Sequence, residues 1–328
     1  MKHASEKLAE PFVRLFWKAQ IGVLRSCPPV CGVVTGLSMG AANSPGLWKK
    51  TLRQLAAQMP RAVLEHGRNR HDKRVVLSRV SFAITARCTL NCDQCAAHIP
   101  DLKEHKDILF DDLNRDIRAL LACVDYIYIV YLSGGETLLH QNLDQLVRLC
   151  AESGKVGSVN VLTNGTIIPD AKTLAALREV NAVVRISKYE PILQPGVAQL
   201  KQVLKHNGIR YTHESGAAWN DMGSSDRLRE GSAKRRFSVC VNQLCVICYY
   251  GKLHLCGESA YLMREGLIPD CEEDYINLSD VSPVEFRVQW RRLLKKRVIS
   301  ACSYCLGDTY KTPKVPVAVQ VKRRDPNC

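Results

Sequence analysis

The 328-residue sequence predicts an α/β protein built on a parallel sheet. From Val75 onward, short apolar runs alternate with helical patterns, and such repeated β-α units form parallel sheets with right-handed crossovers. The run Tyr126–Leu132 is too uniformly apolar to face water on one side, which is typical of a covered parallel strand. The pattern contains closer to six strands than eight.

Residues 1–74 precede this alternation, and we expect them to form a helical extension. Apolar residues recur at helical spacing in Phe12–Ala19 and again in Leu47–Leu64. Between these segments lie Cys27 and Cys31, which are read as ordinary thiols in preference to half of a metal site.

The alternating region 75–214 is expected to hold five strands and four helices. The first helix, for example, carries its apolar residues at i, i+4, i+7, i+8 and i+11, which places them on one face. The strands are predicted at Val75–Thr85, Tyr126–Leu132, Gly157–Thr163, Ala182–Ser187 and Ile209–Tyr211. The helices are predicted around Leu113–Val124, Leu143–Cys150, Ala171–Glu179 and Gln199–His206.

Three cysteines follow the first predicted strand at C-x3-C-x2-C spacing: Cys88, Cys92 and Cys95. Three thiolates on one short loop can hold three irons of a cubane cluster and leave the fourth iron without a protein ligand. An open metal position separates a reactive site from a closed structural one. A three-cysteine zinc site is the alternative for the triplet taken alone.

A second motif, Gly134-Gly135-Glu136, follows the second predicted strand. With both motifs in this order, the sequence resembles the radical S-adenosylmethionine (radical SAM) superfamily, whose members carry them on the same elements. The resemblance covers roughly Val75–Tyr211 and implies a partial (β/α)6 TIM-like barrel. The chain departs from the family at Gln94, where an aromatic residue usually precedes the third cysteine.

The resemblance implies a 4Fe–4S cluster on the three cysteines, with S-adenosylmethionine chelating the open iron. Reductive cleavage of this cofactor yields a 5′-deoxyadenosyl radical that abstracts hydrogen from a substrate. Loops at the carboxyl ends of parallel strands bind ligands in such folds. The residues implied to contact the cofactor are Gly134, Gly135, Glu136, Asn164, Arg185 and Ser187.

Beyond a polar linker at 215–237, residues 238–328 are expected to form a small auxiliary domain. Its start predicts a β-hairpin, because two short apolar strands, Val246–Tyr250 and Leu253–Leu255, flank Gly251. The spacing of Cys240, Gly251 and Cys256 resembles the opening of the twitch and SPASM auxiliary modules.

Cys302 and Cys305 would complete four thiolates for a second 4Fe–4S cluster, which is the preferred ligand set. Cys245, Cys248 and Cys271 are alternatives for one of these positions. A zinc ribbon on Cys245, Cys248, Cys302 and Cys305 is the competing interpretation of the group, because both pairs have C-x2-C spacing.

A helix is predicted to start at a capping box, Ser282-Pro283-Val284-Glu285. Phe286, Trp290, Leu293 and Leu294 would form its buried stripe, and its basic face is expected to be solvated.

We expect a radical SAM oxidoreductase that dehydrogenates a carbohydrate or polyol, with an electron donor such as flavodoxin or ferredoxin. An epimerase and a peptide- or RNA-modifying radical enzyme are alternatives within the family. A non-catalytic zinc-binding protein is the alternative outside it.

Composition agrees with a globular protein, with 46% hydrophobic and 24% charged residues. The sequence contains no apolar run long enough to span a membrane, and we expect a cytoplasmic location. Fifteen cysteines at tight spacings suit metal ligation in a reducing compartment better than a disulfide framework. The net charge of +14 is assigned mainly to solvated surface, and no nucleic-acid partner is expected.

Overall fold

The computed structural model describes residues 74–214, 218–223, 233–309 and 311–322. The helices predicted before residue 74, together with Cys27 and Cys31, lie outside the described residues. Within the described part of the chain, no helix is long and apolar enough to cross a membrane.

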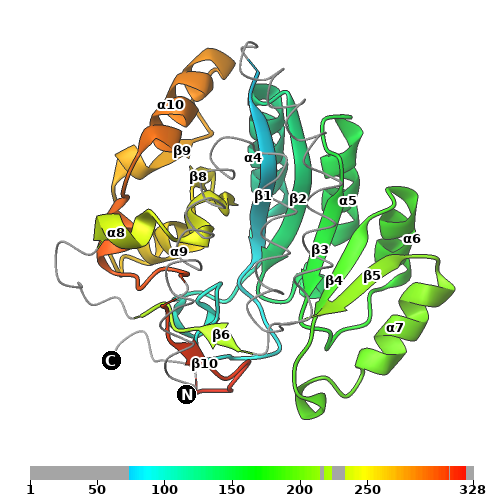
Figure 1. Ribbon diagram of the computed structural model, residues 1–328. Helices are drawn as coiled ribbons and strands as arrows, with labels where there is room; N and C mark the ends of the chain where they lie inside the picture. Colours follow the sequence, from blue (N-terminus) through cyan, green and yellow to red (C-terminus); the bar gives the residue numbers. More distant parts are fainter. Residues whose placement is uncertain (1–73, 215–217, 224–232, 310, 323–328) are drawn as a thin grey trace, which may run out of the picture.

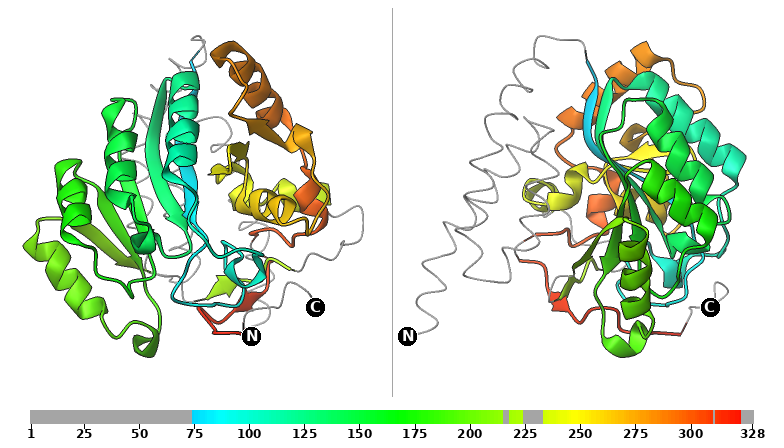
Figure 2. Two further views of the ribbon diagram at one scale, coloured as in Figure 1. Left: turned by 180° about the vertical axis from the view of Figure 1, so that it is seen from behind. Right: turned by 90° about the vertical axis from the view of Figure 1, so that its right-hand side faces the viewer.

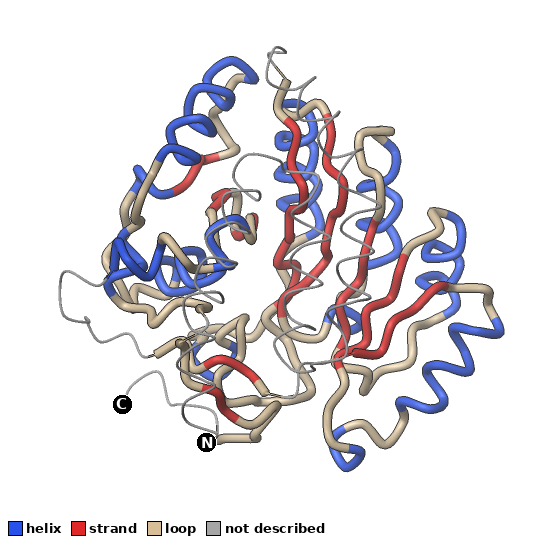
Figure 3. The backbone as a smooth tube through the Cα atoms, in the orientation of Figure 1, coloured by secondary structure: helices blue, strands red, loops and turns tan. Residues whose placement is uncertain are grey.

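One large sheet with eight described strands forms the centre of the structure (Figures 1 and 3). Its order is β5-β4-β3-β2-β1-β7-β8-β9, in which every pair from β5 to β7 is parallel and the last two pairs are antiparallel. A short antiparallel pair, β6 with β10, lies apart from it. The strands are β1 (Val76–Thr85), β2 (Tyr126–Gly134), β3 (Val159–Thr163), β4 (Val183–Ser187), β5 (Arg210–Glu214), β6 (Trp219–Asn220), β7 (Ile247–Tyr249), β8 (Lys252–His254), β9 (Tyr275–Asn277) and β10 (Lys314–Val315).

Helices α4 to α7 cover one face of the parallel strands (Figure 2). They alternate with β1 to β5 along the chain, as the apolar periodicity predicts. The α-helices are α4 (Phe110–Cys123), α5 (Leu143–Glu152), α6 (Ala171–Glu179), α7 (Val197–His206), α8 (Ala233–Phe237), α9 (Gly257–Arg264) and α10 (Pro283–Lys295). Short 3₁₀ turns are η1 (Ile99–Asp101), η2 (Thr137–Leu139), η3 (Pro191–Leu193), η4 (Val241–Leu244), η5 (Glu272–Asp274) and η6 (Ser300–Ser303).

The structure confirms the α/β fold with a parallel sheet. In a barrel whose strands pair in chain order, the sixth parallel strand would lie beside β5, and here it does not. It is β7, which pairs with β1 through Ser81 and Ile247 instead of extending the sheet beyond β5. The hairpin predicted around Gly251 is confirmed, and it continues the large sheet. Segments 75–214 and 238–328 therefore share one sheet.

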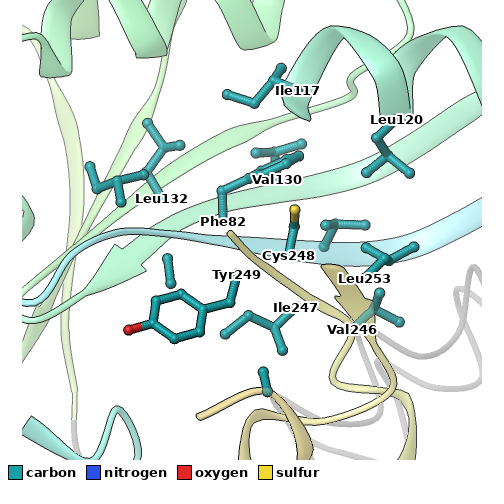
Figure 4. Packing of buried hydrophobic residues seen from close by; sticks show 14 of the residues in the cluster. Phe82, Ile117, Leu120, Val130, Leu132, Val246, Ile247, Cys248, Tyr249 and Leu253 are labelled. Atoms are coloured by element: carbon teal, nitrogen blue, oxygen red, sulfur yellow. The ribbon is translucent and has the colours of Figure 1, made fainter. Parts of the chain in front are cut away.

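The core between β1, β2, β7 and α4 explains this pairing (Figure 4). Phe82 and Ile117 are at most 1% exposed, and the sulfur of Cys248 on β7 enters the same apolar layer. Burying side chains of this size stabilises the fold by about 1.5–3 kcal/mol each. The hairpin thus covers the edge of β1 and completes the packing of α4.

The hairpin turn between β7 and β8 consists of Tyr250 and Gly251, both in the left-handed region with φ of 47° and 72°. Two such residues match a type I′ turn, which suits the twist of adjacent strands. The turn faces Asp116 of α4, which is 2% exposed. A β-carbon at Gly251 would lie 3.3 Å from Oδ1 of this carboxylate.

Gly251→Ala should therefore destabilise the protein by more than backbone strain alone. The left-handed conformation costs an alanine about 1–2 kcal/mol, and here the contact with Asp116 adds to that cost. Gly208→Ala is the matched control, because Gly208 has a similar φ of 68° and no neighbour within 4 Å of an added β-carbon. Thermal unfolding of the two variants measures the difference, and equal losses would remove the role given to Asp116.

The capping box predicted at the start of α10 is present. Ser282 accepts from the backbone N–H of Glu285, and the Glu285 side chain accepts in return from the Ser282 N–H. Phe286, Trp290 and Leu293 are buried as expected, whereas Leu294 is only partly buried. The helix leads directly to η6, which carries one of the predicted ligand cysteines.

Candidate functional site

The loop that carries Cys88, Cys92 and Cys95 lies at the carboxyl ends of β1 and β2 (cyan in Figure 1). Asp107 holds its start, because it accepts hydrogen bonds from Thr85 Oγ1 at 2.6 Å and from the Arg87 guanidinium at 3.1 Å. The three thiols thus stand where parallel α/β sheets commonly bind ligands.

Gly134 and Gly135 pack directly against this loop. Two backbone hydrogen bonds join this segment to the loop. Gly135 N donates to Thr85 O and Glu136 N donates to Arg87 O, each at 2.8 Å. A β-carbon at Gly134 would overlap Thr85 O, and one at Gly135 would overlap Arg87 O. The family resemblance implies that both glycines contact the cofactor; the structure shows in addition that the cluster loop leaves no room for a β-carbon at either position.

Glu136 is fully buried and joins β2 to β3. One of its oxygens accepts from Leu138 N at 3.0 Å, and the other accepts from Asn164 N at 2.7 Å. Burial raises the pKa of this carboxyl to about 7, although the two backbone N–H groups oppose the shift. Both oxygens therefore have backbone partners, and through them Glu136 holds the segments after β2 and β3 together.

Asn164 connects the end of β3 to the cluster loop. Its side-chain amide donates to Thr89 Oγ1 at 2.9 Å and to Cys88 Sγ at 3.6 Å. Its Oδ1 accepts from Thr166, which closes the turn expected there. The sequence predicted either a cofactor contact or a turn residue at this position, and the structure gives it the turn and a contact to a predicted ligand.

Each of the three thiols has N–H groups directed at its sulfur. Cys92 receives the side-chain amide of Gln320 at 3.2 Å, and Cys95 receives backbone N–H groups of Ile99, Ala97 and His98. Donors of this kind stabilise a thiolate ligand. Burial nevertheless raises the pKa of Cys88 to about 11, so in the absence of a cation this thiol is protonated at neutral pH.

The two predicted residues on β4, Arg185 and Ser187, point to the sheet face opposite the helices, because Val184 and Ile186 between them are buried. Ser187 lies at the end of the strand. Two residues later comes Tyr189, whose pKa is raised by burial and further by the neighbouring thiols, Cys92 first.

A second set of thiols lines one small cavity of about 30 Å³. It contains the four preferred ligands Cys240, Cys256, Cys302 and Cys305 together, which reach it from η4, the start of α9, and η6 with the loop after it. Arg236 of α8 also lines this cavity and donates to Cys302 O at 2.7 Å. The sequence analysis placed this arginine in a polar linker, whereas the structure brings it to the cavity wall.

Every sulfur in this cavity has a backbone N–H donor as well. Gly307 N donates to Cys305 at 3.1 Å and Asp308 N donates to Cys240 at 3.4 Å. The Ser259 N–H donates to the Cys256 sulfur, and the Ile299 N–H donates to the Cys302 sulfur. Burial raises the pKa of Cys240 to about 12, which again requires a bound cation before the thiolate forms.

The spare cysteines lie elsewhere. Cys248 faces the apolar core beside α4, and Cys245 receives a hydrogen bond from the Arg79 guanidinium. A zinc ribbon on Cys245, Cys248, Cys302 and Cys305 is therefore contradicted, because Cys302 and Cys305 share their cavity with Cys240 and Cys256. Among the described residues, no three histidine, cysteine or acidic side chains are placed to bind a single metal ion.

The two thiol sites are adjacent. His98, three residues after Cys95, contacts Glu258 at 3.1 Å, and Glu258 lines the second cavity. Burial lowers the pKa of His98, but Asp101 and Glu258 outweigh it and raise the value to about 9. Gly257 also faces the cluster loop, since a β-carbon there would lie 3.6 Å from Ala96 O.

Comparison with known proteins places a family on the segment that carries the first site. Residues 82–187, which include the three-cysteine loop, Gly134-Gly135-Glu136 and the end of β4, match the family model described as the radical SAM superfamily. This part of the chain is a radical SAM domain. The sequence prediction of this family and the α/β fold is thereby confirmed.

Curated relatives of this radical SAM protein include a GTP 3′,8-cyclase of Syntrophomonas wolfei, 25% identical over 118 residues. That alignment covers 34% of this chain and 35% of the cyclase, so the chain matches only about a third of that relative's length. Among solved structures, "Native anSMEcpe with bound AdoMet" has a TM-score of 0.47 at 12% identity and covers 68% of this chain and 81% of the other. BtrN in complex with AdoMet and 2-DOIA has a TM-score of 0.43 at 14% identity, covering 70% and 92%.

The residues of the first site fit the cluster that a radical SAM domain implies. Its three thiols lie on one loop, with Cys92 buried and Cys88 and Cys95 half-buried, and their N–H donors suit a 4Fe–4S cluster with one open iron. Sequence reasoning missed Tyr189, Gln320 and Arg236. Only Tyr189 had a local signal, an aromatic residue just after the carboxyl end of a predicted strand.

Proposed function

We propose that this radical SAM protein dehydrogenates a hydroxylated small molecule such as a carbohydrate or polyol. The observation that carries the proposal is the second cavity, in which four thiols with N–H donors converge beside the radical site. When bound, the first cluster supplies the electron that cleaves S-adenosylmethionine to a 5′-deoxyadenosyl radical, and a fully ligated second cluster supplies a one-electron carrier.

The protein's own residues give the first site its shape. Cys88, Cys92 and Cys95 provide the thiolates, and Gly135 allows the end of β2 to meet their loop. Glu136 keeps β2 and β3 in register beneath it. Each Glu136 oxygen accepts one backbone bond and can accept a second, so this carboxylate remains our proposed acceptor for the cofactor's ammonium group.

The sheet face opposite the helices supports a polar substrate. Strand alternation places hydroxyl, amide and guanidinium groups there on five neighbouring strands, where a hydrocarbon site would carry aliphatic residues. Such groups pair well with substrate hydroxyls, because a site that hydrogen-bonds a hydroxyl discriminates strongly against analogues that lack it. These residues are Ser81, Tyr131, Ser133, Asn160, Arg185, Ser187 and Thr212.

The proposed reaction balances as a two-electron oxidation. With the cofactor bound, a 5′-deoxyadenosyl radical would take a hydrogen atom from a carbon that bears a hydroxyl group and would become 5′-deoxyadenosine. Loss of the hydroxyl proton and of one electron would then form a carbonyl. The cluster that Cys240, Cys256, Cys302 and Cys305 would hold is our proposed acceptor of that electron, and the contact of His98 with Glu258 between the two sites supports this choice.

The test is an anaerobic assay of the reconstituted protein with S-adenosylmethionine, dithionite and a panel of aminocyclitols, hexitols and sugar phosphates. We expect 5′-deoxyadenosine to form in step with a product that has lost two hydrogens. Cys256→Ala should keep cofactor cleavage but lose the oxidised product. Cofactor cleavage without an oxidised product from any of these substrates would contradict the proposal.

Epimerisation is the second candidate, and the position of Cys245 favours it. This thiol contacts Arg79, which lies on the substrate-facing side of β1, whereas the Cys248 thiol is buried on the opposite side. Cys245 is thus the spare thiol placed to return hydrogen to a substrate radical. A product of unchanged mass that carries one solvent deuterium, and that is lost in Cys245→Ala, would select epimerisation.

A further inference from the structure

A segment near the end of the described chain closes over the cluster loop. Residues 318–322, here called the C-terminal strap, pair antiparallel with residues 91–93. Asp93 N donates to Val319 O at 2.7 Å, and Val321 N donates to Asn91 O at 2.9 Å. The Asn91 side chain adds a bond to Val321 O at 2.6 Å. The strap therefore meets the loop at the middle ligand, Cys92.

Gln320 occupies the centre of this pairing, and its amide has one orientation. Its Oε1 accepts from Asn91 N at 2.9 Å. Its Nε2 donates to Ala318 O at 2.8 Å and to Cys92 Sγ at 3.2 Å. A flipped amide would direct its oxygen at a carbonyl and a sulfur, which are both acceptors. The N–H group is thus held on the sulfur by two flanking bonds.

We propose that Gln320 raises the reduction potential of the cluster held by Cys88, Cys92 and Cys95. The proposal rests on the cluster assignment of the preceding section. Hydrogen bonds to cluster sulfurs are among the protein's main means of setting the potential. Reduction adds negative charge to the cluster and its thiolates, so a fixed N–H dipole directed at one thiolate stabilises the reduced state more than the oxidised state.

The position of this residue gives the interaction a further consequence. The donor comes from a point 228 residues away in the sequence and beyond Cys305, the last predicted ligand of the second cavity. Asn164 donates to Cys88 from within the barrel, whereas Gln320 depends on the C-terminal segment being in place. The potential of the first cluster is therefore linked to the folding of the segment that follows the second site.

Two substitutions at Gln320 separate this role from simple packing. Gln320→Met keeps the length of the side chain and removes the donor, whereas Gln320→Lys supplies a charged donor. The residue is exposed, so neither change buries new charge or leaves a cavity. Val319→Ala, at an exposed strap residue whose backbone makes the pairing bond, is the control.

The measurement is an anaerobic redox titration of the reconstituted full-length protein, followed by electron paramagnetic resonance. The signal that changes on adding S-adenosylmethionine identifies the first cluster. For Gln320→Met we expect the reduced-to-oxidised ratio at a fixed potential to fall about tenfold, equivalent to about 59 mV for one electron. Gln320→Lys should shift the potential in the opposite direction, and Val319→Ala should match the unaltered protein.

The outcomes distinguish failure of the proposal from failure of the cluster assignment. Absence of any signal that responds to S-adenosylmethionine in the unaltered protein would refute the cluster itself. With that signal present, equal potentials in all variants, or shifts of the same sign for methionine and lysine, would show that Gln320 only packs. If Gln320→Met loses its iron, the reduction potential of Gln320→Lys is compared with that of the unaltered protein, and equal values would refute the proposal.

Discussion

Replacing Cys88, Cys92 and Cys95 together with alanine is expected to abolish reductive cleavage of S-adenosylmethionine. These three thiols share one loop at the carboxyl ends of β1 and β2, and each has an N–H donor at its sulfur. Without them no open iron can be held beside the glycines of β2. Formation of 5′-deoxyadenosine under dithionite, measured by chromatography, should fall to the level of a reaction without protein.

The same variant should retain an iron–sulfur absorbance, because the thiols of the second cavity remain. We expect roughly half of the iron to be kept, as one of two cubane clusters remains. Removing Cys123 and Cys271, which lie outside both sites, is the matched control and should leave cleavage intact. Full cleavage activity in the triple variant would contradict the assignment of these three cysteines to the radical site.

Gly135→Val should produce the second large effect, a loss of S-adenosylmethionine binding in a protein that remains folded. A β-carbon at this position overlaps Arg87 O and would lie 3.1 Å from the Cys88 side chain. The end of β2 and the cluster loop must then separate, at a cost of about 1–3 kcal/mol or more. Equilibrium binding of the cofactor to the reconstituted protein should weaken at least about tenfold.

Gly196→Ala is the control for this change, because an added β-carbon there meets nothing within 4 Å and the backbone φ of −90° suits any residue. Circular dichroism should show near-native structure for both variants, since Gly135 follows the last residue of β2 and carries no core side chain. Unchanged cofactor affinity in folded Gly135→Val would exclude this position from the site.

Local sequence patterns determined most of the elements that position the radical site. The strands and helices from Val76 to His206 follow period-2 and period-3.6 apolar patterns, which depend only on neighbouring residues. The capping box of α10 and the turn at Gly251 are equally local. The three-cysteine loop was predictable for the same reason, because its ligands lie within eight residues of one another.

Placement of the C-terminal strands was not predictable in this way. β7 pairs with β1 across a separation of more than 160 residues, through Ser81 and Ile247. An apolar pattern shows that a strand has buried faces but does not show which sheet edge it will join. The choice depends on complementary packing, here of Cys248 against the Phe82 side of the sheet.

The candidate sites divide in the same manner. The sequence alone predicted the seven preferred cysteine ligands and the Gly-Gly-Glu motif, since residue type, spacing and the family resemblance carry that information. Only the tertiary structure showed that Gly135 serves the cluster loop, that Arg236 lines the second cavity and that Gln320 reaches Cys92. Each of these is a contact between segments distant in the chain, and its geometry depends on how the intervening residues fold.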